Sequence, residues 1–70
     1  MKDFKKIIGR RIANERKIQG LSQEKLAELS GSHRTYIGLL ERGELNIGIC
    51  NLSEVSKALN CPLEKLFKGL

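Results

Sequence analysis

The spacing of the apolar residues constrains the fold of this chain more than any other feature. Apolar side chains recur at intervals of three or four positions, as in Leu52, Val55 and Leu59. That interval places them on one face of an α-helix, whereas a half-buried strand alternates apolar and polar residues at every second position. The only stretch that looks like such a strand is residues 45–49, which is short and contains glycine. The sequence therefore predicts an all-α fold.

Capping residues divide the first part of the chain into three short helices, expected over about 4–18, 23–30 and 33–42. Their N-cap candidates have a short polar side chain that can accept a hydrogen bond from a free backbone N–H: Asp3, Ser22 and Ser32. Their stops are glycines, which adopt the left-handed backbone of a helix end without strain: Gly20, Gly31 and Gly43.

Two further helices are expected in the last part of the chain, which makes five in all. Asn51 followed by Glu54 resembles a capping box that opens the fourth helix, and Asn60 can end it with a left-handed backbone. Pro62 stands where proline is favoured, at the start of the fifth helix. The segment 45–49 is short and contains glycine, so we expect an ordered loop with its apolar side chains turned inward.

The apolar faces of these helices predict one small core. Its expected members are Phe4, Ile8, Ile12, Leu26, Leu29, Ile37, Leu40, Leu52, Val55, Leu59, Leu63, Leu66 and Phe67. Seventy residues make a single domain, 1–70, and a core of this size leaves little stability to spare. Apolar residues left over in the fifth helix and in the loop before the fourth are expected to form a self-complementary patch in a homodimer.

The charge balance favours a polyanionic partner. Thirteen Lys and Arg oppose eight Asp and Glu, which gives a net charge of +5. DNA, RNA and an acidic membrane surface all fit this charge, and the charge does not choose among them. No apolar run approaches the roughly 20 residues that span a bilayer, and residues 1–6 are charged with no apolar segment after them. A cytoplasmic chain with no membrane partner is therefore expected.

The cysteines and the histidine do not predict a metal site or a cofactor. Cys50 and Cys61 lie eleven residues apart and the single His33 is distant, whereas a zinc site needs about four ligands. A disulfide is the alternative to the reduced, partly buried thiols that we expect in a cytoplasmic protein. No residue has the companions that a nucleophile needs, so we expect no enzyme. The short chain leaves no room for a separate ligand-binding domain, so no small-molecule ligand is expected.

The second and third expected helices are separated by only three or four residues, with Gly31 in the turn. Such a bend leaves the first half of the later helix projecting from the body, and an exposed helix fits the major groove of DNA. The residues that would face base edges are His33, Arg34, Thr35, Gly38 and Leu39. Arg34 can donate two hydrogen bonds to guanine, Thr35 can bond a base or contact a thymine methyl, and Gly38 lets the helix lie close.

Two stretches of the sequence resemble the phage-repressor (XRE/Cro) helix-turn-helix family. They comprise residues 22–28, 31, 37 and 40–43, and then residues 59–67. The match covers roughly residues 8–68, and within the family residues 34–37 are most similar to restriction–modification controller proteins. The resemblance implies a lambda-repressor-like DNA-binding domain whose helix-turn-helix spans about residues 22–42.

The resemblance also implies roles for individual residues. Four of them correspond to contacts with DNA phosphates: Gln23, Tyr36, Arg42 and Asn46. Base-reading positions are held by Arg34 and Thr35 and also by His33, for which a phosphate contact is the alternative. Arg16 and Glu41 correspond to a structural ion pair that orients the recognition helix without touching DNA.

Two positions depart from the family pattern. Glu15 stands where the family usually has an apolar residue, so the first helix either packs differently or exposes this position. Leu39 stands at a base-facing position that often holds a polar residue. It either contacts a thymine methyl or is buried.

These features predict a sequence-specific transcriptional regulator of double-stranded DNA. A homodimer would present two recognition helices about one DNA turn apart, roughly 34 Å, to an inverted repeat. Two alternatives remain open: an antitoxin-like or adaptor module whose main partner is another protein, and a helical bundle that binds RNA or DNA without sequence preference. One Tyr, two Phe and no Trp offer few platforms for stacking single-stranded bases.

Overall fold

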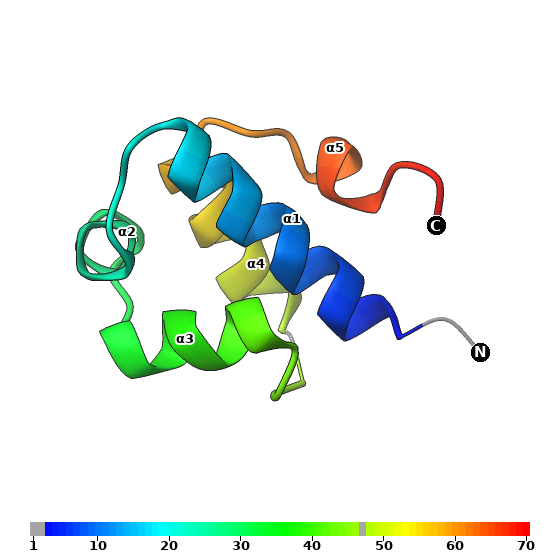
Figure 1. Cartoon of the computed structure of the whole chain (residues 1–70), viewed down its shortest axis with the longest axis horizontal. Helices are drawn as coiled ribbons and strands as arrows, with labels where there is room; N and C mark the ends of the chain where they lie inside the picture. Colours follow the sequence, from blue (N-terminus) through cyan, green and yellow to red (C-terminus); the bar gives the residue numbers. More distant parts are fainter. Residues whose placement is uncertain (1–2, 47) are drawn as a thin grey trace.

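Five α-helices make up the part of the chain that the computed structural model describes, residues 3–46 and 48–70. They are α1 (Phe4–Ile18), α2 (Gln23–Ser30), α3 (Arg34–Arg42), α4 (Ile49–Ala58) and α5 (Leu63–Phe67). α1 crosses the middle of the molecule with α3 below it and α4 behind it, while α2 and α5 lie toward opposite ends (Figure 1). No strand occurs among these residues, so the all-α prediction is confirmed.

Several helix ends are explained by local chemistry. The side chains of Asp3 and Ser22 each accept a hydrogen bond from the backbone N–H three residues on, which satisfies an amide that has no partner inside its helix. Gly31 and Gly43 end α2 and α3 in the left-handed region, with φ of 70° and 71°. Asn60, with φ of 52°, has the same backbone just after α4, as expected.

Two of the expected N-caps are wrong. α3 has His33 as its N-cap rather than Ser32, and α4 begins at Ile49 rather than after Asn51. Neither helix has a side-chain hydrogen bond at its cap, and the capping box expected with Glu54 does not form. The reason is that packing of an apolar face supplies most of the stability of a short helix, so a helix can begin without a capping side chain.

Residues from all five helices form one core. Its buried members are Ile8, Ile12, Leu26, Ala27, Ile37, Leu40, Leu52, Val55, Leu59, Cys61 and Leu66. Leu45 and Leu63 pack against this core and are partly buried. Of the other apolar residues expected to turn inward from the loop, Ile47 and the side chain of Ile49 lie outside the described residues.

Three residues expected in the core are exposed instead: Phe4 at 51%, Leu29 at 50% and Phe67 at 39%. In α2 the inward face is filled by Leu26, Ala27 and Ser30, which leaves Leu29 on the outer side of a helix of eight residues. Phe4 is the first residue of α1 and Phe67 the last residue of α5, so neither is covered by a neighbouring helix on all sides.

Two side chains of α1, Arg11 and Glu15, hold the C-terminal segment around the buried Leu66 against α1. The Nη1 atom of Arg11 donates to the carbonyl oxygens of Leu66 and Lys68, at 3.0 and 2.6 Å. Glu15 pairs with Lys65 at 2.8 Å, and only 18% of the Glu15 side chain is exposed. Glu15, which departs from the family pattern, is therefore largely covered rather than exposed, and it pairs with α5.

Candidate nucleic-acid interface

The turn between α2 and α3 consists of residues 31–33. The N–H of Ser32 donates to the carbonyl oxygen of Ala27 at 2.8 Å, which closes the end of α2. On α3, Ile37 and Leu40 are buried at 0% and 1% exposure. These two anchors hold α3 against the body by one face and leave the opposite face at the surface.

The predicted base-reading residues do not all lie on the outer face of α3. His33, Arg34 and Thr35 are exposed, and Leu39 is half-buried. Gly38 is buried, and a β-carbon added there would lie 3.3 Å from Nη1 of Arg42 and 3.9 Å from Oε1 of Gln23. The space above Gly38 is therefore occupied by side chains of this protein.

A polar cluster links α1, α2 and α3 at the carboxylate of Glu41. Arg16 donates to both oxygens of Glu41, from Nε at 2.6 Å and from Nη2 at 3.0 Å. Gln23 donates to Glu41 from Nε2 at 2.9 Å, and Nη1 of Arg16 donates to the carbonyl oxygen of Leu21 at 2.9 Å. The Arg16 and Glu41 side chains are only 11% and 6% exposed. Hydrogen bonding to Glu41 raises the pKa of Arg16 despite its burial.

The two exposed arginines of α3 each have a carboxylate neighbour. Nε of Arg34 lies 3.6 Å from Oε1 of Glu24 on α2, and Nε of Arg42 donates to Oε2 of Glu44 at 2.7 Å. More than half of each of these four side chains is exposed. Each of these two arginines, both predicted to contact DNA, is thus partly neutralised by a neighbouring carboxylate.

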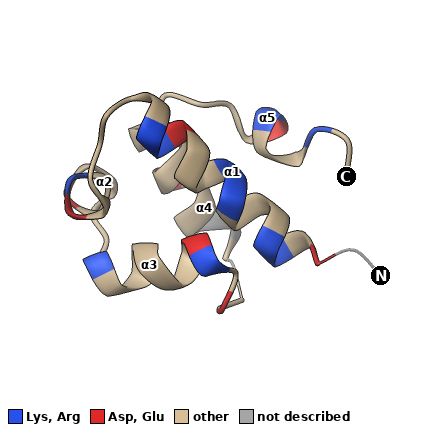
Figure 2. Ribbon diagram, viewed as in Figure 1, with Lys and Arg blue, Asp and Glu red and all other residues tan. Residues whose placement is uncertain are grey.

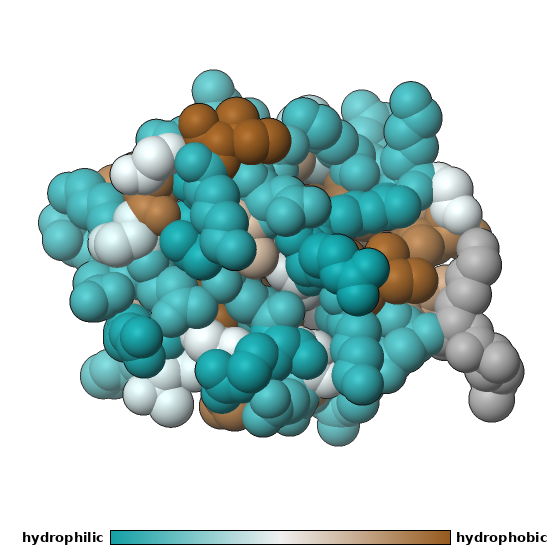
Figure 3. All heavy atoms as spheres, viewed as in Figure 1, coloured by the Kyte–Doolittle hydropathy of each residue, from teal (hydrophilic) through white to brown (hydrophobic). Residues whose placement is uncertain are grey.

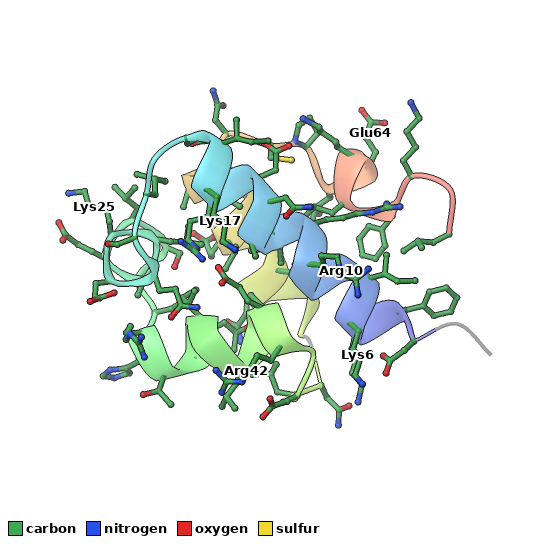
Figure 4. The ribbon with its side chains drawn as sticks, in the orientation of Figure 1. Lys6, Arg10, Lys17, Lys25, Arg42 and Glu64 are labelled. Carbon is green, nitrogen blue, oxygen red and sulfur yellow. The ribbon has the colours of Figure 1, made fainter. Side chains whose placement is uncertain are left out.

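The unpaired positive charge lies mainly on α1, whose length is marked by basic segments in Figure 2. Lys6, Arg10 and Lys17 are exposed. In the described part of the chain, no carboxylate oxygen lies within 4.0 Å of their charged nitrogens, so none of the three forms an ion pair there. Their side chains project from the same side of α1, with Arg42 on α3 below them (Figure 4). Lys6 packs against Gly43, so this basic stripe begins beside the end of α3.

The hydroxyl group of Tyr36 is not exposed, as it would be in a residue ready to contact a DNA phosphate. Its hydroxyl group is buried and has no hydrogen-bond partner among the residues that the structure describes. Burial raises the pKa of this hydroxyl, and the nearby Asn51 side chain partly opposes that effect. Of the other residues predicted to contact phosphates, Gln23 is half-buried, and Arg42 and Asn46 are exposed.

The described residues lack the features of two other kinds of site. They contain no group of three His, Cys, Asp or Glu side chains that could hold a metal ion. None of their helices is long and apolar enough to cross a membrane. Cys61 is a free, buried cysteine, and its burial raises the pKa of the thiol.

Comparison with known families agrees with this geometry. The family model described as helix-turn-helix (HTH_3) matches residues 12–66. The chain belongs to this helix-turn-helix family. The resemblance read from the sequence is therefore confirmed, and so is the fold that it implied.

Among the relatives of this helix-turn-helix protein, control protein C.SmaI of Serratia marcescens is 48% identical over 64 residues, which are 91% of this chain and 76% of that protein. The competence pilus inhibition repressor of Acinetobacter baylyi is 35% identical over 60 residues, 86% of this chain and 54% of that protein. In structure, the restriction-modification controller protein C.AhdI of Aeromonas hydrophila has a TM-score of 0.86 and 40% identity, covering 89% of this chain and 94% of that one.

Sequence reasoning missed the carboxylates beside the arginines of this helix-turn-helix. Glu24 is an acid in the first turn of α2, which the helix dipole favours, and that position alone does not indicate a partner on α3. Glu44 follows Arg42 by two residues, so a contact between these two side chains could have been predicted. Glu24 and Arg34 are ten residues apart, and only the bend between α2 and α3 brings them together.

Proposed function

We propose that this protein is a transcriptional regulator that binds an inverted repeat in double-stranded DNA as a homodimer, with α3 in the major groove. The family and the relatives named as control proteins and repressors support a DNA-binding regulator. The observation that carries the finer proposal is the exposed first turn of α3, in a helix whose last turn is fixed to α1 and α2 by the Arg16–Glu41–Gln23 cluster. A rigidly held helix presents its side chains at fixed positions, as base recognition requires.

In the proposed interface, different residues supply the specificity and the affinity for DNA. Arg34 and Thr35 stand at the start of α3 and supply base contacts, with His33 and Leu39 at the edges of the same surface. Contacts with phosphates come from Gln23, Arg42, Asn46 and, after a change of side-chain conformation that exposes its hydroxyl oxygen, Tyr36. The basic stripe on α1 adds attraction that depends on salt concentration but not on sequence.

An exposed apolar patch supports the proposed homodimer. Hydrophobic surface gathers where the beginning of α1 meets the C-terminal end of the chain (Figure 3). The large exposed hydrophobic side chains of these two segments are Phe4, Phe67 and Leu70. Apolar side chains gathered at one place on a small domain are typical of a surface that another molecule covers, and a second copy of this chain would cover it symmetrically.

Selection from a random duplex pool at about 0.15 M salt tests the proposed function, because non-specific phosphate binding is weak at that ionic strength. We expect enrichment of an inverted repeat with half-sites about one helical turn apart. Uniform recovery would contradict sequence-specific binding. Recovery of no DNA would instead favour a protein partner.

The role of Arg34 has its own test. We expect Arg34→Ala to weaken binding to the selected site by about 1–3 kcal/mol and binding to random duplex much less, because a bidentate guanine contact is made only at the specific site. Affinities for both duplexes are measured by titration at the same salt concentration. Arg34→Ala that weakens both duplexes equally would show a phosphate contact instead.

A further inference from the structure

Glu24 on α2 lies beside Arg34, and its position affects how this arginine can contact DNA. In the protein without DNA, the carboxylate of Glu24 lies 3.6 Å from Nε of Arg34. Both side chains belong to the surface, with 60% and 72% exposure for Arg34 and Glu24. An ion pair on the Nε side leaves the two terminal nitrogens of the guanidinium free, and these can still donate two parallel hydrogen bonds to guanine.

Glu24 also stands at an unfavourable place for binding DNA phosphates. It occupies the first turn of α2, directly after Gln23, where the helix end and the resemblance both favour a phosphate. Its charge reaches the polar cluster behind α3, because it adds to the larger effect of Glu41 in raising the pKa of Arg16. A carboxylate at this place repels a phosphate backbone unless an arginine neutralises it.

We infer that Glu24 is a specificity-determining residue that positions the Arg34 guanidinium and disfavours its use as a phosphate contact. This inference rests on the proposed function. On a random duplex, a phosphate competes with Glu24 for Arg34 and leaves the carboxylate facing DNA. On the specific site, guanine takes the terminal nitrogens while Nε stays beside Glu24. The pair therefore weakens non-specific binding more than specific binding.

Glu28 provides a matched control. It lies four residues further along the same helix, it is also exposed, and its ion pair is with Lys25 at 3.3 Å rather than with a residue of α3. Glu24→Gln and Glu28→Gln each remove one negative charge from α2. Any difference between the two variants therefore reports the position of Glu24 and not the net charge.

The experiment measures the affinities of the wild type and both variants for the selected site and for random duplex. We expect Glu24→Gln to lower the ratio of specific to random affinity about two- to fivefold, the range that an exposed ion pair can supply, and Glu28→Gln to leave the ratio unchanged. In an Arg34→Ala background, Glu24→Gln should no longer change the ratio. Melting temperatures of all variants establish that the fold is intact.

Three outcomes would overturn the inference in different ways. If the wild type selects a site and Glu24→Gln changes the ratio no more than Glu28→Gln, Glu24 has no role in specificity and the proposed function stands. If Glu24→Gln has its full effect in the Arg34→Ala background, Glu24 acts on DNA without Arg34. A wild type that selects no site overturns the proposed function together with this inference.

Discussion

At the scale of single residues, Glu41 shows how one carboxylate can fix the position of a helix, here α3. It accepts hydrogen bonds from Arg16 on α1 and Gln23 on α2, while its own backbone belongs to α3. A buried charge pair contributes little net stability by itself, because both partners lose their hydration. The loss of one partner is costly, however, since the other charge remains buried without compensation.

We therefore expect Glu41→Ala to lower the free energy of unfolding by about 3 kcal/mol, because it leaves the Arg16 guanidinium buried and unpaired. Glu44→Ala is the control: it removes a carboxylate from an exposed pair, and we expect a loss of at most about 1 kcal/mol. Thermal and urea unfolding measure both changes. An unchanged melting temperature for Glu41→Ala together with lost DNA binding would contradict the scaffold role.

At the scale of helices, α1 and α3 approach so closely that their backbones are in contact. A β-carbon added at Gly9 of α1 would collide with the carbonyl oxygen of Leu40 and lie 2.7 Å from that of Glu41. The glycine is needed here because it lets one helix rest on the carbonyl oxygens of the other. The same contact places α1 across the end of α3.

Gly9→Ala should destabilise the protein by about 2 kcal/mol, because the added methyl group forces the two backbones apart. Gly38→Ala is the matched control within α3. Its β-carbon would be tight only against the end of the flexible Arg42 side chain and in ordinary contact with Gln23, and alanine favours a helix by about 1 kcal/mol over glycine. We expect Gly38→Ala to be neutral or stabilising in urea unfolding. Equal losses for the two variants would show that helix contact at Gly9 is not limiting.

At the scale of the whole molecule, the shifted pKa values of two buried groups predict a stability that declines at alkaline pH. Burial, with a smaller effect from Glu15, raises the pKa of Cys61 above its ordinary 9.0, and burial raises that of Tyr36 above 10.0. The folded state therefore binds these protons more tightly than the unfolded chain. The resulting stabilisation is complete below the ordinary pKa and is lost as the pH rises through the folded-state pKa.

We accordingly expect the melting temperature to fall as the pH is raised above about 9, with a shallower fall between about pH 9 and 10 in Cys61→Ala. The comparison uses the slope of melting temperature against pH, because the alanine variant also loses packing in the core. Parallel slopes for the two proteins would assign the alkaline loss to other groups.

The apolar patch of Phe4, Phe67 and Leu70 makes a prediction about assembly. Phe67→Asp should shift the protein from dimer to monomer in sedimentation equilibrium, since a charge would be buried in the proposed interface. Leu29→Asp is the control, because Leu29 is 50% exposed on α2, outside this patch. Both variants should keep their helical content by circular dichroism. A monomeric wild type, or a Phe67→Asp variant that is still dimeric, would exclude this patch as the interface.

Part of this protein was determined by its sequence alone. The helical period, the caps at Asp3 and Ser22 and the glycine stops act over a few residues, so α1, α2 and the turn after α2 could be read directly. The exposed start of α3 followed from the short turn. The Arg16–Glu41 contact spans 25 positions, and it was expected only because the sequence resembles a family in which that pair is structural.

The tertiary structure decided the remainder. It set the start of α4, covered Glu15 with Lys65, left Phe4 and Leu29 exposed, and buried the hydroxyl of Tyr36. It also brought Glu24 to Arg34. Local patterns cannot specify these features, because each depends on which segment, distant in sequence, packs against a given face of a helix. Burial and ion pairing are properties of that packing, and they exist only once the five helices have come together.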